Sequence, residues 1–176
     1  MTADAAFRSI SGSNDDFQQV VVLCESLHDY CLIGGLAINC FVEPVYTMDA
    51  DFALAAAHLD VVKQRLLALD FLVEDHPHSL NAIRSGSQLR IQFTRDERYA
   101  GFPARAEIRE TLGIRLRVAS LADLVQAKIW AWSDPQQRLS KRKKDELDLV
   151  RIAEKYPHFL PQLPEPLRRQ ISGTDL

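Results

Sequence analysis

The sequence predicts an α+β domain, in which a β-sheet is flanked by helices and followed by further helices at the C-terminus. In the first two thirds of the chain, short apolar segments of strand length alternate with amphipathic segments of helix length, whereas only helical periodicity follows Ser120. The 176 residues are 47% hydrophobic and 26% charged, which suits one globular domain with a sizeable core. We therefore expect residues 1–119 to form an α/β core and residues 120–176 a helical segment packed on it as a single compact unit.

The predicted helices rest on apolar residues at helical spacing and on residues that begin or end a helix. Asp15 or Asp16 can cap a first helix, whose apolar residues up to Leu27 share one face. Ser120, three residues before an aspartate, begins a later helix in the manner of a capping box, and prolines end two others. A proline-rich loop and one short helical turn are expected at the C-terminus. After the first helix, the expected helical ranges are Leu36–Val42, Leu59–Leu69, Ser120–Trp132 and Arg138–Tyr156.

Six strands are predicted from short apolar segments bounded by turn residues. The clearest alternation is in Gln88–Thr94, where Leu89, Ile91 and Phe93 share one face and Gln92 lies on the other. The expected strands are Tyr30–Ile33, Asp49–Leu54, Phe71–Glu74, Leu80–Arg84, Gln88–Thr94 and Ile114–Val118.

Charge and cysteine content narrow the partners. The formal net charge of -3 gives the chain no general attraction to nucleic acid, so any such contact needs a local basic patch. No apolar run approaches the roughly 20 residues that cross a bilayer, and the N-terminus lacks the apolar segment of a secretory signal. The three cysteines form no C-x-x-C pair, which is typical of reduced, packed residues. We expect a cytoplasmic protein with no membrane partner.

The most informative segment is IGGLAINCFVEPVYTMDADF, residues 33–52. Gly34 and Gly35, at the mouth of a predicted helix, leave backbone room for a phosphate. Asp49 and Asp51 are spaced i, i+2 on a predicted strand, so they point to the same side, where two like charges favour a bound cation. Carboxylates of this kind bind Mg²⁺, usually together with substrate phosphates. The segment predicts nucleotide chemistry, with a tight turn and a solvated strand face as the alternatives.

This segment resembles the signature of the nucleotidyltransferase superfamily with the polymerase-β-type fold: a hydrophobic residue, two glycines, about a dozen residues, and Asp-x-Asp between hydrophobic residues. The stretches ASLADLVQAKIWAW and KRKKDELDLVRI are similar to the C-terminal helices of the minimal nucleotidyltransferases. The layout is closest to AbiEii-type proteins, several of which act as toxins of toxin–antitoxin pairs. The resemblance runs from about residue 32 to residue 152 and implies a mixed sheet that bears the Asp-x-Asp, with a nucleoside triphosphate (NTP) as donor.

Carried over by position, the resemblance implies a role for each residue of the motif. Gly34 and Gly35 would bring backbone N–H groups to the donor phosphates. Asp49 and Asp51 would bind one or two Mg²⁺ (or Mn²⁺) ions that neutralise the triphosphate and align the attacking hydroxyl. Thr47 matches the threonine of a T-x-D-x-D pattern and would orient the loop or touch a phosphate. The expected reaction is in-line attack on the α-phosphate, with pyrophosphate as the leaving group.

Two positions depart from the family pattern. The family usually carries a third carboxylate on a neighbouring strand, and the best-placed position here is Gln92, whose amide is a poor base and a poor metal ligand. Asp96 and Glu107 are the candidate substitutes. Val45 stands where AbiEii-type toxins often have an arginine. Both departures leave metal and nucleotide binding in place but count against turnover.

Lys128 has two interpretations. It lies within the apolar stripe of its predicted helix, four residues from Leu124 and from Trp132, where a buried ammonium needs an anion. That anion is either a phosphate at the site, as the resemblance implies, or the carboxylate of Asp145 or Asp148 in a structural salt bridge.

The basic run 141–144 also has two interpretations. Pairs at i, i+4, such as Lys141 with Asp145 and Lys144 with Asp148, predict a solvated, self-paired helix face. The resemblance to the family's KDxxD pattern instead places Lys144 beside the pocket, as a phosphate contact. Further positive charge for an RNA acceptor comes from four arginines, although no aromatic residues for base stacking are interleaved with them. These are Arg84, Arg90, Arg95 and Arg98.

Two hypotheses of function follow. The first is a Mg²⁺-dependent minimal nucleotidyltransferase that moves a nucleoside monophosphate from NTP to RNA, protein or a small molecule; as a toxin it would act on tRNA and have a protein antitoxin as partner. The second is a catalytically silent module that binds nucleotide or a partner protein. The intact Gly-Gly and Asp-x-Asp motifs favour the first, and Gln92 favours the second.

Overall fold

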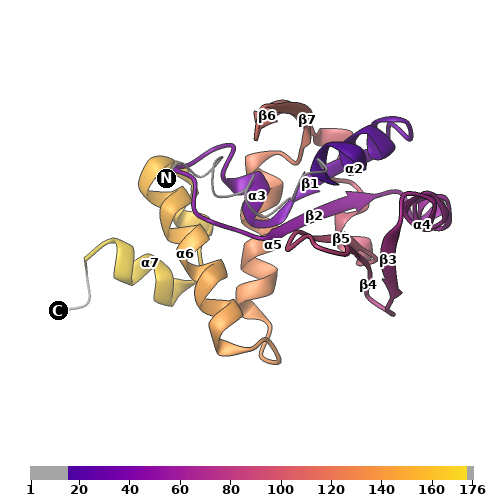
Figure 1. The fold of residues 1–176 in the computed structure, drawn as a ribbon. Coiled ribbons are helices and arrows are strands. Elements are labelled where there is room, and N and C mark those ends of the chain that lie inside the picture. The colour runs from indigo at the N-terminus through magenta and orange to yellow at the C-terminus, as the bar shows by residue number, and fades with distance from the viewer. Residues whose placement is uncertain (1–15, 174–176) are drawn as a thin grey trace.

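The computed structural model describes residues 16–173, in which helices surround one β-sheet (Figure 1). The helical elements include short 3-10 helices, labelled η, in the connections. The helices are α2 (Asp16–Glu25), α3 (Gly34–Ile38), η1 (Ala56–His58), α4 (Leu59–Ala68), η2 (Glu97–Tyr99), η3 (Pro103–Arg105), α5 (Leu121–Ser133), α6 (Leu139–Lys155), η4 (Pro157–Gln162) and α7 (Glu165–Ile171). The strands are β1 (Tyr30–Ile33), β2 (Asp49–Leu54), β3 (Phe71–Asp75), β4 (Ser79–Arg84), β5 (Arg90–Thr94), β6 (Glu107–Thr111) and β7 (Ile114–Val118).

Within the described residues, the sheet has seven strands in the order β3-β4-β5-β2-β1-β7-β6. The pairs β2–β5 and β1–β7 are parallel, and the other four pairs are antiparallel. A mixed sheet with helices around it confirms the predicted α+β class. The arrangement places β2, which carries the Asp-x-Asp motif, in the centre of the sheet.

The two faces of the sheet differ in what covers them. On one face, the rings of Phe52 and Phe93 stack with centroids 5.4 Å apart, and Phe17 of α2 packs on Phe52 at 6.3 Å. The helix α4 packs against α2 and against β3 and β4. Because successive strand residues point to opposite faces, Asp51 and Gln92, which precede the two stacked phenylalanines, lie on the other face.

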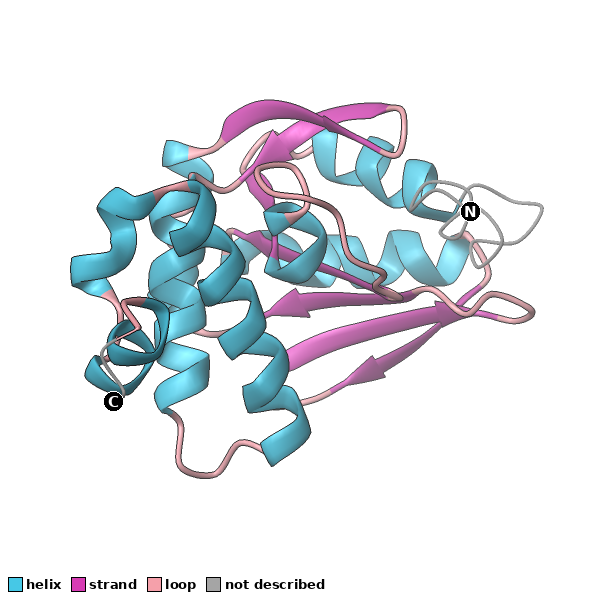
Figure 2. Ribbon diagram, turned by 90° about the vertical axis from the view of Figure 1, so that its left-hand side faces the viewer, coloured by secondary structure: helices cyan, strands magenta, loops and turns pink. Residues whose placement is uncertain are grey.

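The C-terminal helices pack on each other and reach the sheet through α3. The helices α5 and α6 lie side by side (Figure 2), and α3 packs both on β2 and on α5. Their buried residues, such as Val125 and Leu149, belong to the same hydrophobic core as the sheet residues. None of the helices within the described residues has the length and apolar character needed to cross a membrane.

Several predicted helix limits were wrong. The helix after the glycine pair begins two residues early and ends at Ile38, with Asn39 as its C-cap. The Asn39 side-chain amide donates to the carbonyl of Val45 at 2.7 Å and accepts from the Val45 N–H at 3.1 Å. At the C-terminus, η4 occupies much of the expected proline-rich loop, and α7 is longer than one turn. Of the two predicted caps of the first helix, Asp15 lies outside the described residues and Asp16 is already within α2.

The strand β6 was not predicted. Its sequence, Glu-Ile-Arg-Glu-Thr, contains a single apolar residue, Ile108, whose side chain is 54% exposed, so the segment lacks the apolar alternation of a strand. A two-residue turn joins it to β7, with positive φ at both Leu112 (57°) and Gly113 (76°). That geometry is typical of a tight β-hairpin, but leucine at its first position is not a recognisable turn signal.

Candidate active site

Asp49 and Asp51 lie on the same face of β2 in the middle of the sheet, as their spacing predicts. Asp51 is level with Ile33 of β1 and with Gln92 of β5. Asp49 is level with Arg90 of β5. The carboxylates therefore stand next to the end of β1, where the chain turns into α3 at the glycine pair.

Gly34 brings the backbone against the Asp51 side chain. Its φ is +72°, and a Cβ atom at this position would lie 2.3 Å from Oδ2 of Asp51. Only glycine allows both the left-handed conformation and the close approach. A Cβ at Gly35, in contrast, would meet no atom within 4 Å, so there is open space beside the second glycine.

Asp51 is a carboxylate without a direct partner. Among residues 16–173 it makes no ion pair or hydrogen bond. Burial and the neighbouring Asp49 charge raise the pKa of Asp51 to about 6, although Lys128 and Lys141 partly offset them. The anionic form of Asp51 therefore lacks compensation, as is common where a carboxylate is placed for a cation or for proton transfer.

Asp49 is held from two sides. Nε of Arg90 lies 2.7 Å from its Oδ1, and both side chains are about half exposed. The hydroxyl of Thr47 accepts a hydrogen bond from the Asp49 N–H at 3.2 Å, so Thr47 orients the chain as it enters β2. Orienting the loop is one of the two roles that the resemblance implies for Thr47, and contact with a phosphate stays a prediction.

Lys128 forms a structural salt bridge with carboxylates of α6, which is one of its two predicted interactions. Its Nζ lies 2.7 Å from Oδ1 of Asp145 and 2.7 Å from Oδ2 of Asp148, on the adjacent α6. Burial lowers the pKa of Lys128, but the two carboxylates outweigh it and raise the pKa above the ordinary lysine value. Lys128 also lies close enough to Asp51 to lower the pKa of that carboxyl. The two carboxylates of α6 neutralise the Lys128 ammonium, and contact between Lys128 and a phosphate stays a prediction.

The predicted i, i+4 pairs of α6 were wrong. Asp145 and Asp148 face Lys128 instead of Lys141 and Lys144, because the buried side of α6 packs on α5. Lys144 is exposed, and its role at the pocket stays a prediction.

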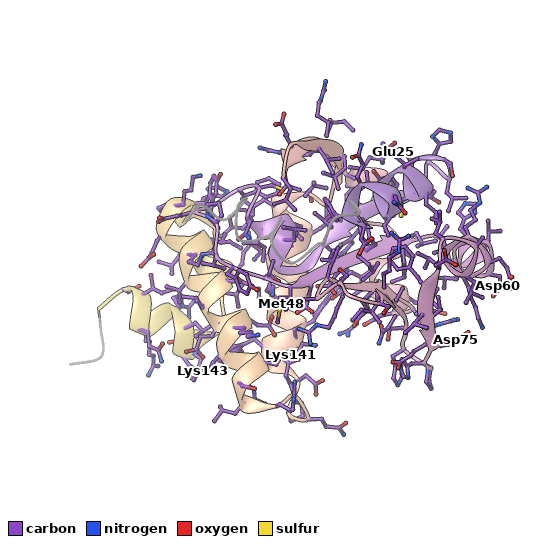
Figure 3. All side chains as sticks on the ribbon, in the orientation of Figure 1. Glu25, Met48, Asp60, Asp75, Lys141 and Lys143 are labelled. Carbon is purple, nitrogen blue, oxygen red and sulfur yellow. The ribbon has the colours of Figure 1, made fainter. Side chains whose placement is uncertain are left out.

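Two residues near the carboxylates were missed in the sequence. Lys141 lowers the pKa of Asp51, and Figure 3 shows it on the side of α6 toward Met48, the residue before Asp49. Tyr99 of η2 also feels the charges of Asp51 and Lys128; burial, followed by the charge of Asp96, raises its pKa to about 12. The sequence did not distinguish Lys141 from the other basic residues of the run 141–144. No sequence pattern pointed to Tyr99 as a residue near the site.

The third carboxylate of the family pattern has no counterpart on the neighbouring strand. The residue in register with Asp51 is Gln92, as predicted, and its side chain is exposed. Asp96 is engaged by Arg98 at 2.6 Å, and Glu107 lies on β6, three strands from β2. Within residues 16–173 there is no group of three or more His, Cys, Asp or Glu placed to hold a metal ion.

The donor set nevertheless fits a hard divalent cation. Asp49 and Asp51 offer carboxylate oxygens on one face, and such oxygens are the ligands that Mg²⁺ and Mn²⁺ prefer. Because Gly34 has no Cβ atom, the Asp51 side chain can occupy its observed position. The negative charge of Asp51, which no described residue neutralises, is available to a bound cation. With few protein ligands, Mg²⁺ commonly completes its shell with water and substrate phosphates.

The arginines considered for an RNA acceptor are all paired with carboxylates. In addition to the Arg90 and Arg98 pairs, Arg84 donates to Asp16 at 2.6 Å and Arg95 to Asp75 at 2.6 Å. Their charge is therefore largely balanced within the protein.

A cavity of about 620 Å³ lies between α2 and α4, lined among others by Val22, Leu23 and Leu69. These helices cover the sheet face that carries Phe52, so this cavity is separate from the carboxylates on the opposite face.

Comparisons with known proteins show the fold. No family model matches the chain, and no curated protein matches its sequence. Among solved structures, it is similar to ANT(2")-Ia in complex with adenylyl-2"-tobramycin, with a TM-score of 0.59, 14% identity and coverage of 91% of this chain and 97% of that one. The lincomycin-bound lincosamide antibiotic adenylyltransferase LnuA gives a TM-score of 0.54, 13% identity and coverage of 78% and 96%. An antigenic nucleotidyltransferase-like protein from Paracoccidioides brasiliensis gives 0.51, 18% identity and coverage of 92% and 88%. The chain thus has a nucleotidyltransferase fold.

Proposed function

We propose that this chain is a Mg²⁺-dependent nucleotidyltransferase that moves a nucleoside monophosphate from NTP to a hydroxyl group of an acceptor. The observation that carries the proposal is the packing of Asp51 on Gly34, beside Asp49, on the face of a nucleotidyltransferase-type sheet opposite the stacked phenylalanines. A structural role does not require an unpartnered carboxylate against a glycine with positive φ.

In this proposal each element at the end of β1 and on β2 has a task. Asp49 and Asp51 hold Mg²⁺ or Mn²⁺, which neutralises the triphosphate and aligns the reacting groups when bound. Gly34 and Gly35 leave space in which the donor phosphates approach the backbone. Thr47 keeps the chain before β2 in place. Lys141 adds a positive charge from α6, on the same side as Asp51.

The reaction is a phosphoryl transfer. The acceptor oxygen attacks the α-phosphorus, the bond from that phosphorus to the bridging oxygen breaks, and pyrophosphate leaves with the electron pair. The proton of the hydroxyl passes to water. Because the chemistry needs little covalent participation by protein, positioning and charge stabilisation are the main contributions of the residues above.

For the acceptor we favour a small hydroxyl-bearing molecule over RNA. The arginines around β5 are paired with carboxylates, so they offer little free charge to a phosphate backbone. Two similar structures carry small molecules, lincomycin in one case and adenylyl-2"-tobramycin in the other. The toxin role, a tRNA acceptor and a protein antitoxin stay predictions of the resemblance to AbiEii-type proteins.

Nucleotide binding tests the proposal. We expect calorimetry to show that the wild-type protein binds at least one NTP in the presence of Mg²⁺ and much more weakly without it. The double variant Asp49→Asn/Asp51→Asn should lose this binding, whereas Asp75→Asn, which alters an aspartate on β3, should retain it. Equal binding by all three proteins, or by none, would contradict the proposal.

The second candidate function is a module that binds nucleotide but does not turn it over. It is favoured by Gln92, which lies level with Asp51 where a third carboxylate would stand. If this is correct, Gln92→Asp should create transfer from α-labelled NTP to an acceptor, while the wild type shows binding alone. Turnover by the wild type would exclude the silent module.

A further inference from the structure

Arg90 occupies the position from which it can control the metal site. It is level with Asp49 on the adjacent parallel strand, and its Nε lies 2.7 Å from Oδ1 of that carboxylate. Among the described residues this is the only ion pair made by either aspartate of β2. One of the two proposed metal ligands is thus already engaged by a cation of the protein itself.

We propose that Arg90 is a positioning residue that masks Asp49 in the metal-free protein and competes with a divalent cation for it. This inference rests on the proposed function, because it assigns Asp49 to the metal. When a cation binds, the Arg90–Asp49 contact opens, so the protein holds free metal less tightly than its two carboxylates allow. A metal ion that arrives with the donor triphosphate is then favoured over the free ion.

The charges support this competition. A guanidinium and a divalent cation both require the same Oδ1 lone pairs, and within residues 16–173 the Arg90 guanidinium pairs with no carboxylate other than Asp49. Once released, Arg90 keeps five N–H donors, which match the geometry of phosphate oxygens. The phosphates of a nucleotide bound with the metal would therefore replace the Asp49 carboxylate as partners of the Arg90 guanidinium. The metal alone would leave Arg90 without an anionic partner.

The size of the effect follows from exposure. The Arg90 side chain is 57% exposed and that of Asp49 is 42% exposed. Because exposed ion pairs are weak, we expect the masking to change metal affinity by roughly two- to fivefold, not by orders of magnitude. A shift of this size is enough to make metal binding depend on the nucleotide when free Mg²⁺ is close to the dissociation constant.

Binding of Mn²⁺ alone tests the inference, with the free ion followed by electron paramagnetic resonance and no nucleotide present. Arg90→Met should bind Mn²⁺ about two- to fivefold more tightly than the wild type. Arg90→Lys, which keeps the charge, should remain near the wild type. Arg95→Met is the control, because Arg95 pairs with Asp75 on β3 at 2.6 Å and Asp75 is about as exposed as Asp49.

The outcomes separate this inference from the proposed function. Equal or weaker Mn²⁺ binding by Arg90→Met, while Asp51→Asn abolishes binding, would overturn the role of Arg90 and leave the metal site standing. No Mn²⁺ binding by any variant would overturn both. Tighter binding by Arg95→Met as well would show a general charge effect and also overturn the inference. Thermal denaturation of each variant confirms that the comparison is made on folded protein.

Discussion

Two pairs of aspartates, Asp49 with Asp51 and Asp145 with Asp148, stand close together in this protein and differ in their partners. On α6, Asp145 and Asp148 share Lys128, and Asp148 also binds Arg151 at 2.8 Å. On β2, within the part of the chain that the structure describes, Asp49 pairs with one exposed arginine and Asp51 forms no ion pair. Similar carboxylates thus form a structural network on α6 and a candidate metal site on β2. The difference between the two pairs is the number of basic side chains that the fold places beside them.

The largest expected effect on stability is at the pair whose charges are neutralised, Asp145 and Asp148. Lys128→Met leaves two buried carboxylates without their shared cation, and we expect it to lower the free energy of unfolding by about 3–5 kcal/mol. Lys144→Met, on the exposed side of α6, should change it by less than about 0.5 kcal/mol. Urea denaturation measures both. A cost below about 1 kcal/mol for Lys128→Met would show that the network is not needed for stability.

Removal of the negative charge at Asp51 is expected to raise the free energy of unfolding, in contrast to the loss expected at Lys128. Because the pKa of Asp51 is raised from 3.8 to about 6 in the folded protein, ionisation of Asp51 opposes folding. This penalty is absent below pH 3.8, grows as the pH rises to about 6 and is constant above it. Asp51→Asn should therefore stabilise the metal-free protein by up to about 3 kcal/mol at pH 8, with a gain that shrinks as the pH falls below 6.

Denaturant titrations of the wild type and Asp51→Asn at several pH values, in the presence of a chelator, measure this gain. Asp145→Asn is the matched comparison and should destabilise, because it removes a partner of Lys128. If Asp51→Asn destabilised the metal-free protein at pH 8, Asp51 would belong with the structural pair and not with the candidate site.

A smaller effect is expected at Gly34. Gly34→Ala places a side chain at a φ of +72° and forces the Asp51 carboxylate to move, so we expect a loss of about 1–2 kcal/mol in stability and weaker Mn²⁺ binding. Gly35→Ala is the control, since its Cβ would meet nothing within 4 Å. Thermal denaturation and Mn²⁺ titration give the two readouts. Equal behaviour of the two variants would contradict the close packing of Gly34 on Asp51.

Much of the central sheet could be predicted from local pattern. Alternation in β5 placed Gln92 on the polar face, and the register confirms it as the neighbour of Asp51. The spacing of Asp49 and Asp51 required a common face, which the structure confirms. The strand β6 escaped prediction because an edge strand with one exposed side has no core to impose apolar alternation.

The residues that complete the site were harder to predict, because they come from elements far away in the chain. Lys128 had two possible anions, and only the packing of α5 on α6 brought Asp145 and Asp148 to it. The same packing turned Lys141 toward Asp51, whereas the family pattern had pointed to Lys144. Arg90 was a member of a basic group in the sequence, and its pairing with Asp49 depends on the parallel register of two strands that are not adjacent in the chain.

By itself, the sequence determined the α+β class, the glycine turn and the shared face of the two aspartates. These features depend on the conformational freedom of glycine and on the periodicity of strands, which act within a few residues. Only the tertiary structure decided which carboxylates are neutralised and which are not. Ion pairs form between whatever side chains the fold brings within about 4 Å, and that distance is not encoded in local spacing.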